Sequence, residues 1–533
     1  MAAVVEEAVT AGGADEVKPY KIHVSSKYLD LTRQKLEVTR LPHELADPKS
    51  KDWWEPKSQI EPLIDYWLEQ YSWRTQEELL NTELPQFRTG LSIPSAKAAV
   101  RIHFIHVHSS HANAIPLLLI PPFPFSNLSL AHLIKLFITP EDDKNDQSFH
   151  LVIPSLPGLG FSDALPNNTP VISATAELLN ALMSRLSYPH YLATNTGAGT
   201  ASPAEIDFKL ADYLVTCYPD SCLGAHFLSP PLTRPRMQEA PIEWARWRVA
   251  KLFRSPMLGY HEEDFLALRR TGYVRRPKAK KSPTPAQFGL NNLSVWEPNT
   301  LAYALCDSPT GLLVFVLKGL RLLSPQKDFT PTEIINFAQL AWLPGPEAAM
   351  RFWAHCISHP EKVERKAARK PKIGVTVFLG EKPNTEAKGG GPEQEGAEDC
   401  YTCPSWANVG YNVVYTRRAT GRSGLLAWEQ PETIVAGIRG VAAAVLKSDT
   451  RLRPARTPAV ALLEQVPAHT GVAGGQAPSV PRTSPASSRP APERPEEHNQ
   501  PHRKINDEAA VGSSEKATDK ELSTSATPSP AHG

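Results

Sequence analysis

A short turn after a predicted strand holds hydroxyl side chains that could act as nucleophiles. The strand 191–193 is followed by TNTGAGT, residues 194–200, with Thr196 near its middle. A nucleophile flanked by small residues is typical of a strand-to-helix elbow. Threonine needs a neighbouring base to react, and His355 and His359 are the histidines that could supply one. The simpler interpretation is that both histidines are solvated.

Two cysteines, Cys400 and Cys403, form a CxxC motif. A structural zinc site needs four ligands, and no second pair lies nearby, so we expect two free thiols. The glycine-rich segment GVAGGQ at Gly471 lies in a Pro- and Ser-rich tail, without the strand and helix that a phosphate-binding loop requires. The sequence therefore predicts no metal and no cofactor.

The composition narrows the class of protein. The chain has 533 residues, a formal net charge of +1, 41% hydrophobic residues and 21% charged residues. A nucleic-acid partner is not expected, because binding one usually requires a strongly basic face. Six cysteines in so long a chain favour a reducing compartment over a disulfide framework. With no signal-peptide pattern and no apolar run near the ~20 residues of a membrane span, we predict a cytoplasmic protein.

Proline, at 51 of 533 residues, is about twice as frequent as usual, which indicates that part of the chain does not pack. We expect a disordered leader over residues 1–18 and a disordered Pro- and Ser-rich tail over 449–533. The tail has too little apolar surface to offset the entropy cost of ordering it. Two loop insertions are also expected, near residues 275–292 and over 382–403. Translated introns are an alternative explanation of the insertions and the tail.

Between these segments, short apolar runs alternate with stretches of helical periodicity. The runs typical of strands are 100–107, 116–120, 150–153, 191–193 and 373–378, and the periodic stretches are 175–186 and 433–446. Strand–helix alternation over this length predicts an α/β fold, with a mostly parallel sheet covered by helices on both faces.

Five longer motifs follow one another along the chain. They are WWEPKSQIEPLIDYWLEQYSWRTQEELLNTELPQFRT at 53–89, PLLLI at 116–120, PSLPGLGFSD at 154–163, LAYALCDSPTGLL at 301–313 and LLAWEQPE at 425–432. Together they resemble the epoxide hydrolases of the microsomal type. The resemblance implies an α/β-hydrolase fold with three parts: an N-terminal meander over 19–98, a core over 99–227 completed by 371–447, and a mostly helical lid over 228–370.

The resemblance also implies a reaction, in which an epoxide and water give a vicinal diol without a metal or cofactor. An aspartate attacks the epoxide and forms an ester, while two lid tyrosines hydrogen-bond the epoxide oxygen. A histidine oriented by a carboxylate then activates the water that cleaves the ester, and backbone N–H groups bind the oxyanion.

The positions that match this machinery depart from it at three places. The nucleophile falls on Gly197, the general base on Gly424 and the second lid tyrosine on Trp353. Glycine can neither form an ester nor activate water. An indole N–H can donate a hydrogen bond but does not readily give up its proton.

Other positions keep part of the family pattern. Glu381 matches the orienting carboxylate and Tyr273 the first lid tyrosine. The oxyanion region falls on Phe123, Phe125 and Ala198. In the loop PPFPFS, residues 121–126, the prolines have no N–H to donate.

Three hypotheses follow. The first is a pseudoenzyme of the epoxide hydrolase family, which keeps the fold and a pocket for a small hydrophobic epoxide-like molecule while its reaction is impaired or lost. The second is an active epoxide hydrolase, or another α/β hydrolase, that uses relocated residues. The third is a non-catalytic binding protein whose tail recruits protein partners.

Overall fold

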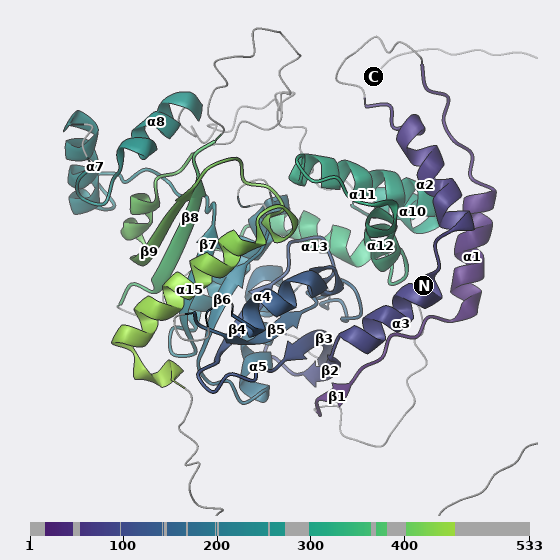
Figure 1. Cartoon of the computed structure of the whole chain (residues 1–533), viewed down its shortest axis with the longest axis horizontal. Coiled ribbons are helices and arrows are strands. Elements are labelled where there is room, and N and C mark those ends of the chain that lie inside the picture. The colour runs from purple at the N-terminus through teal and green to yellow at the C-terminus, as the bar shows by residue number, and fades with distance from the viewer. Residues whose placement is uncertain are drawn as a thin grey trace, which may run out of the picture. The chain divides into compact units, whose positions relative to one another are not determined.

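The apolar runs of the sequence form the middle of a nine-stranded sheet (Figure 1). The strands lie in the order β1-β2-β3-β5-β4-β6-β7-β8-β9. Their bounds are β1 Lys18–Pro19, β2 Gln86–Leu91, β3 Val100–Val107, β4 Ile115–Ile120, β5 Phe149–Pro154, β6 Tyr191–Asn195, β7 Cys222–Leu228, β8 Lys372–Phe378 and β9 Asn412–Ala419. The pairs β1–β2, β2–β3 and β3–β5 are antiparallel, and the pairs from β5 through β4 to β9 are parallel. The α/β fold with a mostly parallel sheet is confirmed.

The computed structural model describes residues 16–45, 54–95, 98–140, 142, 146–166, 169–197, 199, 202–253, 256–271, 298–363, 369–380 and 401–453. All of them belong to the first of two units of the chain, Met1–Thr457. The expected insertion at 275–292 and the tail beyond 453 lie outside the described residues.

Helices cover both faces of the sheet, as the alternation of apolar runs and helical periodicity predicts. Those packed on the core are η1 Asn127–Leu133, α4 Ile134–Ile138, α5 Val171–Arg185, η3 Pro203–Glu205, α6 Ile206–Cys217, η5 Pro404–Val409, α14 Leu426–Glu429, α15 Pro431–Ser448 and η6 Thr450–Leu452. Helix α15 packs on β6 to β9, whereas α6 packs on β4, β6 and β7 beside α5.

Strand β4 shows why the central strands consist of uninterrupted apolar residues. Leu117 and Leu119 join the apolar cluster that contains α15, whereas Leu118 and Ile120 join the cluster that contains α5 and α6. Successive side chains of a strand point to opposite faces. Both faces of this sheet are covered, so every position of the strand has to be apolar.

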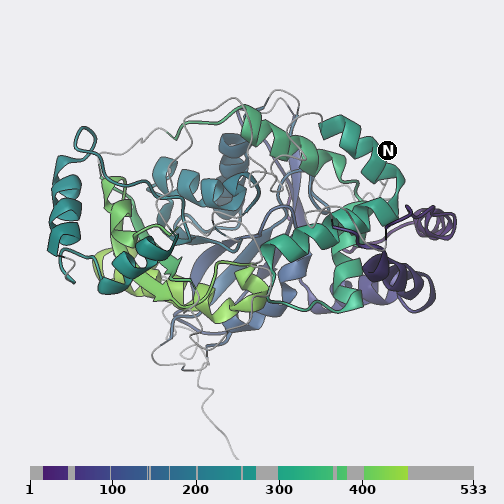
Figure 2. The ribbon, with the colours of Figure 1, turned by 90° about the horizontal axis from the view of Figure 1, so that it is seen from above.

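The remaining helices form the N-terminal segment and the region between β7 and β8. They are α1 Ser26–Glu37, α2 Lys57–Glu69, α3 Trp73–Glu83, α7 Pro241–Phe253, α8 Glu262–Thr271, α10 Pro298–Asp307, α11 Pro309–Leu323, α12 Pro331–Trp342 and α13 Glu347–Ser358. We call α10 to α13 the lid. Figures 1 and 2 show α1 and α2 against the lid, and side-chain bonds join them: Tyr66 Oη to Thr332 Oγ1 at 2.8 Å, and Trp342 Nε1 to Thr32 Oγ1 at 2.8 Å.

None of the described helices is, by itself, long and apolar enough to cross a membrane. Helices α10 and α11 meet the criterion of length and composition only as a pair, across a bend of 117°.

Residues at three of the predicted boundaries belong to the described fold. Lys18, predicted in the leader, is the first residue of β1. Tyr401 and Cys403, predicted in the insertion over 382–403, are buried, and the Tyr401 hydroxyl donates to Asp264. Leu452, predicted in the tail, is buried in the last turn. Cys403 is a free thiol, as expected, and Cys400 lies outside the described residues.

A buried histidine cross-links three central strands. His226 of β7 is within hydrogen-bond distance of Thr194 Oγ1 on β6, at 3.2 Å, and of Thr376 Oγ1 on β8, at 2.9 Å. Its ring packs so closely on α15 that a side chain at Gly437 would overlap it. Burial, together with the charge of Arg417, lowers the pKa of His226 to about 3, so the ring is neutral in the folded protein.

This histidine makes the stability of the fold depend on pH. The unfolded chain binds a proton near pH 6.5, where the folded chain does not. The contribution of His226 is therefore complete above that pH and is lost as the pH falls toward 3. We expect the free energy of urea unfolding to fall between about pH 7 and pH 5, and the fall to be shallower in His226→Gln by up to about 1.4 kcal/mol per pH unit. Equal slopes in the two proteins would contradict this role.

Candidate functional site

The site lies where the order of the parallel strands reverses. From β4 the chain crosses to β5 on one side, and β6 lies on the other side of β4. In open α/β sheets the connections that diverge at such a point leave a crevice at the carboxyl ends of the strands, where ligands bind. Here the crevice is bordered by the loop after β4, which contains Phe123 and Phe125, and by the turn after β6, which contains Thr196 and Gly197.

The Thr196 hydroxyl is not placed as a nucleophile. It is buried and donates to the carbonyl oxygen of Ile120, at the end of β4, at 2.8 Å. It thereby ties the turn after β6 to the neighbouring strand. His355 stacks on His359, with ring centroids 4.6 Å apart, at the end of α13. The prediction of a threonine nucleophile thus gains no support.

The carboxylate of Asp207, from helix α6, fills the space beside Gly197. Asp207, in the first turn of α6, is fully buried. Its Oδ2 accepts hydrogen bonds from the Gly197 N–H at 2.9 Å and from Asn195 Nδ2 at 3.0 Å, and its Oδ1 accepts one from Ser202 Oγ at 2.7 Å. A Cβ at position 197 would lie 2.7 Å from Asp207 Cγ and closer still to its Oδ2. The nucleophile position is therefore already occupied.

The backbone after the turn explains how Asp207 reaches this place. Helix α6 begins only at Ile206, and the two residues before it, Ala204 and Glu205, have φ values of 49° and 55°. Residues other than glycine rarely adopt such left-handed backbone. The two residues redirect the chain so that the first turn of α6 faces back toward Gly197. Burial raises the pKa of Asp207, although its three hydrogen-bond donors act in the opposite direction.

The general-base position is filled in a similar way. A Cβ at Gly424 would lie 2.7 Å from Cδ of Glu429, the last residue of α14. Glu429 Oε1 accepts from Ser324 Oγ, just after α11, at 2.7 Å. The Glu429 carboxylate beside Gly424 therefore also holds the end of a lid helix.

The two loops that carry the base and the orienting carboxylate in the family are neighbours here. The Gly380 N–H donates to the Gly421 carbonyl at 2.9 Å, so the loop after β8 lies beside the loop after β9. Glu381 and Tyr273, which match the orienting carboxylate and the first lid tyrosine, lie outside the described residues, and their roles stay predictions.

The expected oxyanion region is only partly described. The Phe125 N–H donates to the Pro122 carbonyl at 2.8 Å, so this donor is already used within the loop. The Phe123 ring is buried against Phe352 and Trp353, with centroids 5.7 and 6.2 Å away. Ala198 lies outside the described residues.

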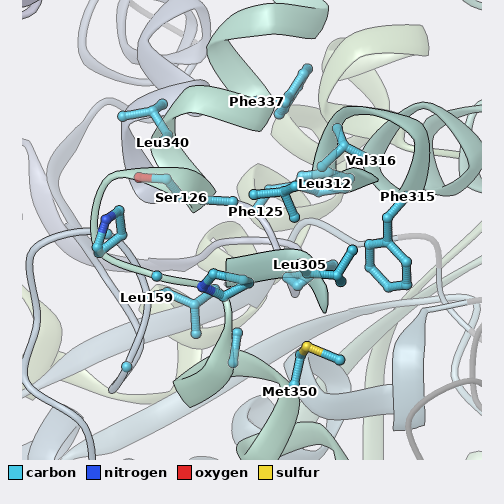
Figure 3. Close-up of a pocket in the computed structure, with 18 of the residues that line it drawn as sticks. Phe125, Ser126, Leu159, Leu305, Leu312, Phe315, Val316, Phe337, Leu340 and Met350 are labelled. Carbon is cyan, nitrogen blue, oxygen red and sulfur yellow. The ribbon is translucent and has the colours of Figure 1, made fainter. Parts of the chain in front are cut away.

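An apolar cavity lies between the lid and the loop after β4 (Figure 3). It encloses about 730 Å³, including the open space at its mouth, and Trp353 forms part of its wall. Figure 3 shows Phe315, Phe337 and Met350 directed at this space from α11, α12 and α13. Among the described residues only Ser126 and the indole of Trp353 bring polar side-chain atoms to the wall.

The cavity and the catalytic positions are separate. Gly197, Asp207, Gly424 and Glu429 do not belong to its wall. A second space of about 300 Å³ shares Phe125, Phe315 and Trp353 with it and reaches Pro203, next to the turn after β6. In the part of the chain that is described, no three His, Cys, Asp or Glu side chains are placed to hold a metal ion.

The sheet order, the covering helices and the lid define an α/β hydrolase. A solved structure supports this fold: the juvenile hormone epoxide hydrolase of the silkworm Bombyx mori matches with a TM-score of 0.61 at 19% identity, over 81% of this chain and 95% of that one. The family model "Epoxide hydrolase N terminus" matches residues 17–130.

Two curated relatives extend the likeness along the chain. Epoxide hydrolase 1 of Sus scrofa is 23% identical over 80% of this chain and 89% of its own length. Juvenile hormone epoxide hydrolase 2 of Ctenocephalides felis is 24% identical over 64% of this chain and 70% of its own. The chain is thus similar to epoxide hydrolases along most of its length.

The sequence motifs led to the glycines but not to the carboxylates that fill the space beside them. An aspartate in the first turn of a helix is usually placed there by the helix dipole, so nothing distinguished Asp207 from an ordinary helix start. Glu429 belongs to the motif LLAWEQPE, but the motif does not indicate that its carboxylate lies beside Gly424. The cavity residues, such as Phe315 and Met350, carried no signal beyond helical apolar periodicity.

The occupied nucleophile position makes a prediction about stability. Because a side chain at position 197 collides with a buried carboxylate, we expect Gly197→Asp to lower the free energy of unfolding by about 1–3 kcal/mol. Combining it with Asp207→Ala should recover most of the loss, since one buried carboxylate then replaces another at the same place. The quantity measured is urea unfolding of the single and double variants.

The matched control is Gly319→Ala on α11, where an added Cβ would meet nothing within 4 Å. It should be neutral or stabilise the protein by up to about 1 kcal/mol through helix propensity. Strictly additive losses from Gly197→Asp and Asp207→Ala would show that the two positions do not compete for one space.

Proposed function

We propose that this protein is a non-hydrolytic member of the epoxide hydrolase family that binds a small apolar molecule without converting it. The observation that carries the proposal is that both positions of the aspartate–histidine chemistry are glycines whose side-chain space is taken by other residues. A lost side chain alone could leave a vacant site. Here the turn after β6 is built around Asp207, and the loop after β9 is built around Glu429.

The remaining carboxylate at the turn is poorly suited to nucleophilic attack. Asp207 is fully buried and its two oxygens accept three hydrogen bonds, from Asn195, Gly197 and Ser202. A nucleophile has to reach the substrate carbon with a free lone pair in line. The cavity wall does not include Asp207, so a molecule bound there does not touch it.

The cavity supports binding. Its wall is almost entirely apolar, with Ser126 and the Trp353 indole as its polar groups, and small-molecule sites are likewise mostly apolar with few polar groups. Its aromatic walls favour burial of hydrocarbon through the hydrophobic effect. The names of the relatives suggest a probe, because the flea and silkworm proteins are juvenile hormone epoxide hydrolases. Juvenile hormone is therefore a suitable apolar ligand to offer this chain.

A cytoplasmic location remains part of the proposal. What supports it is cysteine usage: the five described cysteines are Cys217, Cys222, Cys306, Cys356 and Cys403, and all are free thiols. Free thiols are the usual state in a reducing compartment.

The test combines binding with turnover. We expect radiolabelled juvenile hormone to bind and to be recovered unchanged, and styrene oxide to give no diol above the uncatalysed rate. Ala349→Trp, which adds an indole to the cavity wall, should weaken hormone binding by about tenfold or more because it fills the space the ligand needs. Leu322→Trp, on the exposed face of α11, is the matched control and should bind normally. Diol formation at about 1 s⁻¹ or faster would refute the proposal.

A second candidate function rests on the same two carboxylates. Because Asp207 and Glu429 stand where the family has its nucleophile and base, a relocated hydrolysis could use Asp207 as the nucleophile and Glu429 as the base. This requires the turn to open so that Asp207 meets the substrate.

That candidate predicts the outcome of two isosteric substitutions. Asp207→Asn and Glu429→Gln should each lower epoxide turnover by roughly 10⁴-fold, as removal of a nucleophile or base does in other hydrolases. Glu381→Gln and Tyr273→Phe should lower it as well. Turnover that persists in Asp207→Asn would exclude this residue as the nucleophile.

A further inference from the structure

Helix α7 presents an apolar face to solvent. Leu252 and Phe253 are 77% and 64% exposed, and Ile242 and Val249 are exposed as well. Large apolar side chains that gather on the surface of a folded chain mark a site of interaction. In Figures 1 and 2, α7 lies at the opposite side of the folded unit from α1.

The spacing of these residues is that of one face of a helix. Relative to Ile242, Val249 and Leu252 are seven and ten positions further on, so the three lie along one stripe. The opposite face carries Trp247 and Ala250, which are buried against the protein. Helix α7 is thus apolar on both faces, and only one of them is covered.

The turn after α7 continues the exposed surface. Met257 and Leu258 are exposed, and Leu258 has a φ of 56°, in the left-handed region that favours glycine. A leucine gains nothing from this backbone or from exposure to water. The turn between α7 and α8 thus directs the Leu258 side chain outward.

This surface is held rigidly on the core. The Trp247 ring lies 5.4 Å from the ring of Trp406 in η5 and 6.0 Å from that of Phe265 in α8. The buried Asp264 of α8 receives two hydrogen bonds from Arg418 of β9, at 2.7 and 2.8 Å. The middle of α7 is therefore tied to the core through Trp247, and the exposed stripe extends from there to the end of the helix.

Basic residues border the apolar stripe. Arg246 and Arg248 flank it on its two sides, and Lys251 lies one turn further on. Helix α7 carries three basic side chains and one acidic one, Glu243, whose carboxylate pairs with Arg246 at 2.9 Å, so its net charge is +2 against +1 for the whole chain. Positive charge is concentrated on the segment that exposes the apolar residues.

We propose that α7 and the turn after it form a docking surface for an anionic lipid bilayer. A helix that exposes Leu and Phe on one face, with Lys and Arg beside them, lies in the plane of a membrane interface. There the apolar residues enter the acyl boundary and the basic residues meet anionic headgroups. The protein would bind peripherally, independently of whether its cavity holds a ligand.

A second copy of the chain fits the surface less well. In a two-fold pairing the same face meets itself. Arg246 and Arg248 lie next to the centre of α7, so each would face its counterpart in the other copy. Like charges at that place oppose the pairing, whereas an anionic surface attracts them.

The experiment measures how the full chain partitions onto vesicles. We expect it to float with vesicles of phosphatidylcholine and phosphatidylserine, less with phosphatidylcholine alone, and less as the salt concentration rises. Leu252→Glu with Phe253→Glu should abolish flotation. Arg248→Gln with Lys251→Gln should lower partitioning onto anionic vesicles by roughly 30-fold.

The matched control is Leu79→Glu on α3, an exposed leucine away from α7, which should float normally. All four proteins should share the circular dichroism spectrum and the thermal midpoint of the native chain. Flotation that survives Leu252→Glu with Phe253→Glu would overturn the proposal. So would a native dimer, seen by light scattering, that this variant dissociates, because the surface would then be covered by a second copy.

Discussion

The Asp207 carboxylate, buried at the carboxyl ends of β4 and β6, constrains everything around the site. A buried carboxylate is tolerated only if its oxygens are hydrogen-bonded, and here Asn195, Gly197 and Ser202 supply the donors. These donors come from the end of a strand, from the turn and from the segment before α6, so all three have to keep their places. Position 197 has to be glycine, because any side chain would displace the carboxylate. Asp207 and the turn after β6 therefore fill the crevice on the side of the strand ends.

The same principle applies at Gly424 and extends to the lid. Glu429 fills the space beside this glycine and accepts a hydrogen bond from Ser324, just after α11. The lid therefore rests on a residue of the LLAWEQPE motif that lies beside the position matching the base. The carboxylates of Asp207 and Glu429 are hydrogen-bonded elsewhere and do not line the cavity. The cavity is lined by aromatic and aliphatic side chains such as Phe315 and Phe337. Among the described residues, no carboxylate or histidine lines this space.

The protein has two apolar surfaces of different character. The inner one lies between the lid helices and the loop after β4. The outer one, on α7, is open, bordered by Arg246 and Arg248, and fixed to the core through Trp247. An enclosed surface selects a ligand by shape, whereas an open surface with a basic margin suits an extended anionic partner. The two lie on different elements, so a change on one should leave the other unaffected.

The sequence by itself determined the α/β fold and the order of its motifs, and it predicts that the nucleophile and base positions fall on Gly197 and Gly424. Apolar runs such as 116–120 predict buried strands because both faces of a parallel sheet are covered, and a glycine at a motif position is evident without coordinates. Only the tertiary structure decided that the carboxylates of Asp207 and Glu429 lie beside these two glycines. Asp207 reaches Gly197 because Ala204 and Glu205 adopt left-handed backbone, a choice made by the surrounding packing and not by local propensity. The exposure of Leu252 was equally hidden, because a helix that is apolar on both faces predicts burial until its neighbours are seen.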